Sequence, residues 1–199
     1  MHTTLPTRLA GLLAAVLLAL TACGGDTDET TSSIPDSEPF NQADVDFATQ
    51  MIPHHAQALL MVDAAAPRDD LSPELTALVE KIRTAQTGEI ELMTDWLEDW
   101  DQPIPDNPRD HGGMEDGSMG DLDMPGMATE EEMSALGDAS GSAFEQMWLQ
   151  MMTEHHEGAI EMAEDEVADG EFPETVALAE EIAKAQAAEI DQMEQMLGG

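Results

Sequence analysis

Apolar side chains recur every three or four residues in four long segments of this chain. These segments span about residues 41–65, 72–100, 142–168 and 173–197. Such spacing gathers the apolar side chains on one face of an α-helix. The pattern therefore predicts an all-α fold with four long helices.

Residues that favour helix starts precede several of these segments. Asn41 is a suitable N-cap for the first segment. The pairs Thr129/Glu132 and Ser142/Glu145 have the spacing of a capping box, in which each residue satisfies a backbone N–H of the other. The first box predicts an additional short helix, and the second predicts that the third long helix begins at Ser142.

The two halves of the folded part repeat each other. Residues 51–61 and 152–162 both read Met-x-x-His-His-x-x-Ala-x-x-Met, and residues 82–93 and 182–193 both read Ile-x-x-Ala-Gln-x-x-Glu-Ile-x-x-Met. A repeat of this kind indicates a duplicated structural unit. The sequence thus predicts one domain over 40–199 made of two helical hairpins, 40–100 and 129–199, with a Met- and Gly-rich loop, 101–128, between them.

The N-terminal segment has the features of an export signal. Arg8 precedes an apolar run, residues 9–20, that ends in small residues before Cys23, so residues 1–22 are expected to be a signal peptide. A retained transmembrane helix is the alternative, but the run falls short of the roughly 20 residues that a bilayer requires. Residues 24–39 are polar and are expected to form a flexible tether.

Cys23 is the only cysteine, so an intramolecular disulfide and a Cys-x-x-Cys metal site are both excluded. The Leu20-Thr21-Ala22-Cys23 sequence resembles the lipobox of bacterial lipoproteins, which implies cleavage before Cys23 and lipidation of its thiol. Residues 23–39 are then expected to be the lipidated cysteine and a disordered linker. The net charge of −37 repels nucleic acid and anionic headgroups. We therefore expect a membrane partner through the lipid anchor and no nucleic-acid partner.

Histidines and methionines share one face of each repeated helix. At about 100° per residue, Met51, His54, His55 and Met61 fall within an arc of roughly 120°. The second copy places four further residues in the same way: Met152, His155, His156 and Met162. On the following helices a narrower stripe holds six residues that could support them: Gln86, Glu89, Met93, Gln186, Glu189 and Met193.

Polar groups on an apparent core face need partners, because burying them unpaired costs several kcal/mol. One interpretation is that the histidines and glutamates satisfy each other while the methionines fill the core. The other is a metal site, which two adjacent histidine pairs favour. Thioether and imidazole ligands favour Cu(I), with zinc or iron less favoured.

The loop carries a second group of possible metal ligands: His111, Met114, Met119, Met124 and Met127. A disordered acidic linker explains this composition equally well.

The paired Met-x-x-His-His segments, the repeated Ala-Gln-x-x-Glu-Ile helices and Met124-Pro125-Gly126-Met127 resemble the domain of unknown function 305 family. The resemblance covers about residues 40–197. It implies a ferritin-like four-helix bundle, with His54, His55, His155 and His156 as the histidine motifs. Some relatives are linked to copper binding in the periplasm, and no catalytic activity is established for the family.

We therefore expect an extracytoplasmic, lipid-anchored protein on the cell membrane or periplasmic side that binds copper as a buffer, carrier or sensor. Two alternatives stay open at this point. A ferritin-like redox metalloenzyme could use Glu89 or Glu189 beside the histidines, although a binding role is favoured over an enzymatic one. A metal-free structural or interaction module would use the His–Glu pairs for packing alone. The sequence does not indicate a protein partner.

Overall fold

The computed structural model describes residues 34–35, 37–106 and 124–198. Within these ranges all regular structure is helical, which confirms the all-α prediction. Five helices follow one another along the chain: α1 (Gln42–Ala65), α2 (Pro73–Asp99), α3 (Glu130–Asp138), α4 (Gly141–Asp169) and α5 (Pro173–Leu197).

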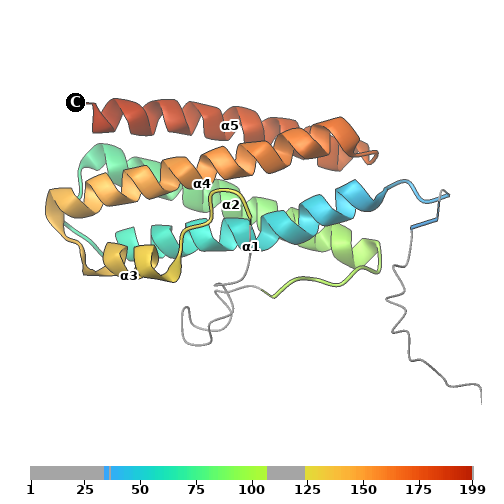
Figure 1. The fold of residues 1–199 in the computed structure, drawn as a ribbon, viewed down its shortest axis with the longest axis horizontal. Coiled ribbons are helices and arrows are strands. Elements are labelled where there is room, and N and C mark those ends of the chain that lie inside the picture. Colours follow the sequence, from blue (N-terminus) through green and yellow to red (C-terminus); the bar gives the residue numbers. More distant parts are fainter. Residues whose placement is uncertain (1–33, 36, 107–123, 199) are drawn as a thin grey trace, which may run out of the picture. The chain divides into compact units, whose positions relative to one another are not determined.

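The four long helices form two hairpins. α1 packs along α2 and α4 packs along α5, while α1 and α4 join the hairpins by packing against each other (Figure 1). The short helix α3 contacts both α1 and α4. The arrangement confirms the prediction of a four-helix bundle built from two duplicated hairpins.

The helix starts follow local sequence in two cases and tertiary contacts in a third. Capping boxes form at Asn41 and at Thr129, as predicted. The box predicted for Ser142 and Glu145 is wrong, because α4 begins one residue earlier, after Ser140. The Glu145 carboxylate instead accepts a hydrogen bond from the backbone N–H of Ser72, at the start of α2. A contact between hairpins has replaced the local cap.

A polar layer divides the bundle core into two apolar clusters. One cluster includes Met61 of α1 and Trp148 of α4, and the other includes Met51 of α1 and Ala159 of α4. Between them lie eight polar residues, two from each long helix: His54, His55, Gln86, Glu89, His155, His156, Gln186 and Glu189. We call these eight residues the polar layer.

Several sequence predictions fall outside the described residues. These are the signal peptide, 1–22, the lipidation site Cys23, and the loop residues His111, Met114 and Met119. Along the ranges that the structure does describe, none of the helices combines the length and apolar composition needed to cross a membrane.

Residues 124–128, which we call the strap, cross the α1–α4 junction in direct contact with α4. A Cβ atom added at Gly158 would lie 2.0 Å from the carbonyl oxygen of Pro125. At Gly126, where φ is +73°, a Cβ atom would lie 2.4 Å from the carbonyl oxygen of Glu154. Gln57 of α1 fixes the end of the strap by donating to the Ala128 carbonyl (2.8 Å) and accepting from its N–H (2.7 Å).

This contact predicts opposite effects for two glycine substitutions in helix interiors. Gly88→Ala should stabilise the protein by roughly 0.5–1 kcal/mol, because alanine favours helix and nothing lies within 4 Å of the new Cβ atom. Gly158→Ala should lose that gain and lower the melting temperature, because the strap must lift away from α4. Thermal unfolding followed by circular dichroism measures both, and equal stabilisation by the two substitutions would contradict the close crossing.

Candidate metal centre

The four histidines of the repeated motif lie in the bundle interior. His54, His55, His155 and His156 have no exposed surface. α1 is buried without interruption from Met51 to Leu59, because α2, α4 and the strap surround this part of it. The imidazoles are therefore shielded from water and can be satisfied only by other protein groups or by a bound ligand.

One histidine of each pair is hydrogen-bonded to a glutamate of the following helix. His55 Nε2 lies 2.7 Å from Glu89 Oε2, and His156 Nε2 lies 2.7 Å from Glu189 Oε2. The two pairs differ in their surroundings. Glu189 is 5% exposed and also pairs with Lys81 Nζ at 3.2 Å, whereas Glu89 is 19% exposed.

The other histidine of each pair is hydrogen-bonded to backbone carbonyls. His54 Nε2 donates to the Pro125 carbonyl of the strap at 2.9 Å, and His155 Nε2 donates to the His54 carbonyl at 3.0 Å. The rings of His54 and His155 lie against each other, with centroids 3.8 Å apart and planes inclined by 41°. The α1–α4 contact thus brings together histidines that are about a hundred residues apart in the sequence.

These partners assign the same tautomer to all four imidazoles. Each Nε2 atom faces an acceptor oxygen, so a neutral ring carries its proton on Nε2 and keeps a free lone pair on Nδ1. All four Nδ1 atoms are buried, and none has a hydrogen-bond partner. Histidines that bind metals commonly have this arrangement, with one ring nitrogen donating to a carboxylate or carbonyl and the other free for the metal.

The environment keeps the rings of His54, His155 and His156 neutral. The pKa of His54 is lowered to about 3, mainly by burial and then by the neighbouring His55. Burial also holds the pKa of His155 well below its usual value, with His54 adding to the effect. The pKa of His156 is lowered by burial, although the hydrogen bond that it donates to Glu189 opposes the shift. A neutral imidazole is the form that binds a metal, so these nitrogens need lose no proton first.

Glu189 is held in the charged form. Burial acts to raise its pKa, but the hydrogen bond from His156, followed by the hydrogen bond and the charge of Lys81, outweighs burial and lowers the pKa. An ionised Glu189 accepts the Nε2–H of a neutral His156. The pair therefore fixes the orientation of the ring without a formal ion pair.

The predicted methionines adjoin the polar layer from both sides. Met51, Met93 and Met162 belong to one apolar cluster, and Met61, Met152 and Met193 belong to the other. The amides of Gln86 and Gln186 lie in the polar layer itself, where both amide atoms of Gln86 and the Oε1 atom of Gln186 lack hydrogen-bond partners. Core filling alone does not account for so many unsatisfied polar atoms.

The donor set fits a soft ion better than a hard one. In the described part of the chain, no three His, Cys, Asp or Glu side chains are grouped as a metal ion would require. The glutamates act as hydrogen-bond acceptors for histidine, which leaves imidazole nitrogen and thioether sulfur as the free donors. Soft Cu(I) accepts such ligands at low coordination number, whereas magnesium, calcium and manganese favour carboxylate and carbonyl oxygens.

The structure also shows which supporting residues the sequence analysis missed. The strap is held by Gln57 of α1 and lies directly on Gly158 of α4, and its Pro125 carbonyl accepts from His54. Lys81 reaches the second hairpin to pair with Glu189. Met124 and Met127, the described members of the predicted loop group, lie on the strap and are half-buried. The internal repeat contained one sign of the strap. Gln57 corresponds to Gly158, and this difference between the two copies marks the place where the strap crosses the helices.

Comparisons with known proteins identify close structural relatives. A DUF305 protein from Streptomyces coelicolor is 33% identical, with a TM-score of 0.68 over 78% of this chain and 92% of that chain. A DUF305 fragment from Deinococcus radiodurans is 29% identical, with a TM-score of 0.66 over 81% and 99% of the two chains. CopM in its Cu(I)-bound form is 29% identical, with a TM-score of 0.60 over 77% and 94%.

The sequence comparison agrees with the structural one. No curated protein matches this chain. Residues 44–197 match the family described as Domain of unknown function (DUF305). That range includes both His-His motifs, all four long helices except the first two residues of α1, and the strap. The chain belongs to the DUF305 family.

Proposed function

We propose that this protein binds Cu(I) outside the cytoplasm as a copper buffer, carrier or sensor. The observation that carries the proposal is the set of four buried Nδ1 lone pairs without partners. His54, His55, His155 and His156 would supply imidazole nitrogen, and the adjoining methionines would supply thioether sulfur: Met51, Met61, Met152 and Met162. Glu89, Glu189 and the strap carbonyl would orient the rings.

A structural relative supports the choice of metal. CopM, which shares this fold, has been crystallised in Cu(I)-bound, Cu(II)-bound and Ag-bound forms. Silver and Cu(I) are both soft monovalent ions, so binding of both fits the imidazole and thioether donors of this chain. Copper is cargo in this proposal, and no reaction is assigned to it.

We also propose that the folded unit is tethered to a membrane through Cys23. The tether would follow from removal of residues 1–22 and lipidation of the new N-terminal cysteine. A relative from Streptomyces coelicolor is named as a secreted protein, which agrees with export of this chain. A lipid tether at Cys23 would hold the folded unit, and any Cu(I) bound to it, at the membrane surface.

The metal proposal predicts how a double substitution, His54→Leu with His155→Leu, changes copper binding and stability. Both Nε2 atoms bond to backbone carbonyls, so no buried glutamate loses its partner. The metal-free melting temperature should stay the same or rise, because two unsatisfied Nδ1 atoms are removed. Affinity for Cu(I), measured by competition with a chromophoric chelator, should fall at least tenfold.

Wild-type protein supplies the positive reference for that experiment. Free Cu(I) at a hundred times Kd should stabilise it by about 2.7 kcal/mol and raise the melting temperature by on the order of 5–10 °C. His156→Leu is the matched comparison, since it also lowers affinity but leaves Glu189 buried without its histidine and should destabilise the metal-free protein. If Cu(I) shifts neither protein and the double variant unfolds, the histidines serve packing alone.

The tether proposal predicts the effect of Cys23→Ser on cell fractionation. Without the thiol no lipid can be attached, so the protein should move from the membrane fraction to the soluble extracytoplasmic fraction. The helical content and the Cu(I)-dependent shift in melting temperature should not change, because the folded helices begin at residue 42. A Cys23→Ser protein that stays in the membrane fraction would refute lipid anchoring at this residue.

A further inference from the structure

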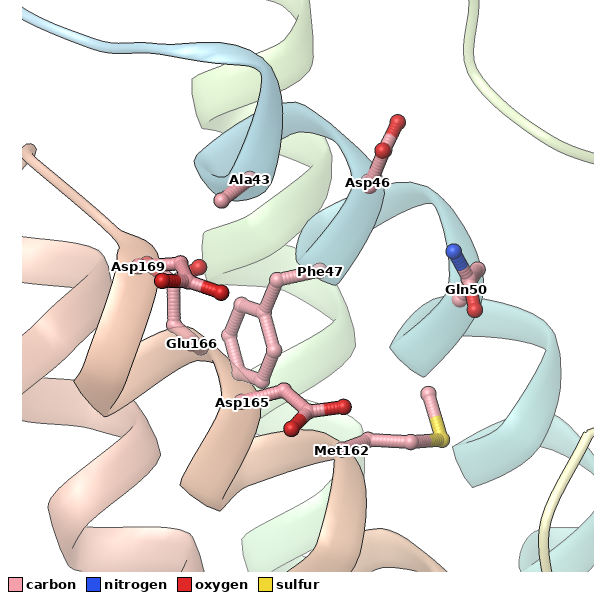
Figure 2. Close-up of a pocket in the computed structure, with 8 residues that line it drawn as sticks. All are labelled: Ala43, Asp46, Phe47, Gln50, Met162, Asp165, Glu166 and Asp169. Atoms are coloured by element: carbon pink, nitrogen blue, oxygen red, sulfur yellow. The ribbon is translucent and has the colours of Figure 1, made fainter.

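The seam between α1 and α4 is covered at the histidines by the strap, which is not helical. Gln50, one helical turn before His54, and Met162 line a pocket of about 230 Å³ in this seam (Figure 2). At the next turn the seam is closed, because His54 has no exposed surface and its Nε2 atom donates to the Pro125 carbonyl of the strap. The strap therefore covers the section of the seam where His54 lies.

The strap is attached to the helices by a few polar contacts rather than by a buried apolar face. The side chain of Gln57 holds Ala128, and the carbonyl of Pro125 accepts from His54. Residues 124–128 are all half-buried, whereas every long helix contributes fully buried apolar side chains. Segments that bury little apolar surface open at a lower free energy than the helices that form the core. The strap is thus the part of this enclosure that can open while the bundle stays folded.

The contact between the strap and α4 is made by backbone atoms. The two glycines at this contact, Gly126 and Gly158, each lie so close to a carbonyl oxygen of the other segment that a Cβ atom would not fit. Lifting the strap therefore separates two backbones and exposes little apolar surface. It also leaves no cavity of the kind that follows the loss of a large buried side chain.

Contacts link the strap to the histidines of both copies of the repeat. His54 donates to the strap, and the His54 carbonyl accepts from His155 Nε2 at 3.0 Å. The rings of His54 and His155 also lie against each other, with centroids 3.8 Å apart. His54 is thus in contact with both the strap and the histidine of the second copy, and a movement of the strap would change the surroundings of both rings.

We propose that the strap is the gate through which Cu(I) reaches and leaves the histidines. The identity of the ion rests on the proposed function, whereas the opening of the strap is a property of the metal-free protein. When the strap lifts, His54 loses the acceptor of its Nε2–H, and water and ions gain a path to its ring. Such a gate slows both binding and release, which favours a carrier that retains its ion over a buffer that exchanges it rapidly.

The first test uses the full chain without metal. Carbethoxylation by diethyl pyrocarbonate, followed by peptide mass spectrometry, measures how fast each imidazole becomes accessible. Gln57→Ala removes both hydrogen bonds to Ala128, and Gly158→Ala pushes the strap away from α4. Each variant should speed modification of His54 by about tenfold, the effect of losing one or two hydrogen bonds. His156, which is bonded to Glu189 of α5, should react no faster than in the wild type.

The second test measures the rates of Cu(I) uptake and release by stopped-flow exchange with a chromophoric chelator under anaerobic conditions. Both rates should rise by about tenfold in the two strap variants, while Kd stays within about threefold, because a looser gate speeds entry and exit alike. Two substitutions of the same kind are the matched controls. Gln50→Ala lies on the exposed face of α1, and Gly88→Ala meets nothing within 4 Å, so both should behave as the wild type does.

Three results would overturn the gate. The first is modification of His54 at the same rate in the strap variants and the controls. The second is an equal increase for His54 and His156, which would show that the whole bundle opens. The third is unchanged Cu(I) rates in strap variants that still bind Cu(I), which would place the entry elsewhere on the bundle. If the wild type binds no Cu(I) but the strap variants expose His54, the copper proposal fails and the strap stands as the cover of the histidines.

Discussion

The need to satisfy polar side chains in the middle of a hydrophobic core governs this fold. Each long helix contributes two polar residues to the polar layer, and each unsatisfied atom there costs about 1–3 kcal/mol. The hydrogen bonds account for the glutamates and for every histidine Nε2 atom. They leave the four Nδ1 atoms without partners. Burial keeps the rings of His54, His155 and His156 neutral. A bundle that needed stability alone would be better served by leucine at these positions.

Duplication produced the polar layer, and later divergence gave its two halves different surroundings. His54 and His155 occupy equivalent positions in the repeat. His54 nevertheless donates to the Pro125 carbonyl of the strap, whereas His155 donates to the backbone carbonyl of His54. Gln57 holds the strap where Gly158 makes room for it. Lys81 forms an ion pair with Glu189, whereas Glu89 is partly exposed to solvent. The two His–Glu pairs therefore differ in that one glutamate is partly exposed and the other is enclosed, although both histidines are fully buried.

Much of the fold was predictable because helices and internal repeats can be recognised from local sequence. The spacing of apolar residues and the caps at Asn41 and Thr129 determine elements that need no distant partner. The Ser142 cap failed because Glu145 bonds to Ser72 of another hairpin, and sequence patterns do not show which hairpins touch.

The candidate site was likewise predictable only in part. The shared helix face grouped the histidines and glutamates correctly, since that grouping follows from helical geometry. The ring tautomers, the contact between the His54 and His155 rings and the strap contact all depend on how α1 meets α4.

Four buried imidazoles whose Nδ1 atoms lack partners form the proposed site for a soft metal. Long-range ¹H–¹⁵N NMR of histidine-labelled protein reads the protonation of each ring nitrogen directly. We predict that His54, His155 and His156 are neutral Nε2–H tautomers at pH 7, and that Cu(I) shifts the Nδ1 resonances of all four histidines while Nε2 stays protonated. Rings that are protonated on Nδ1, or Nδ1 resonances that do not respond to Cu(I), would contradict the account.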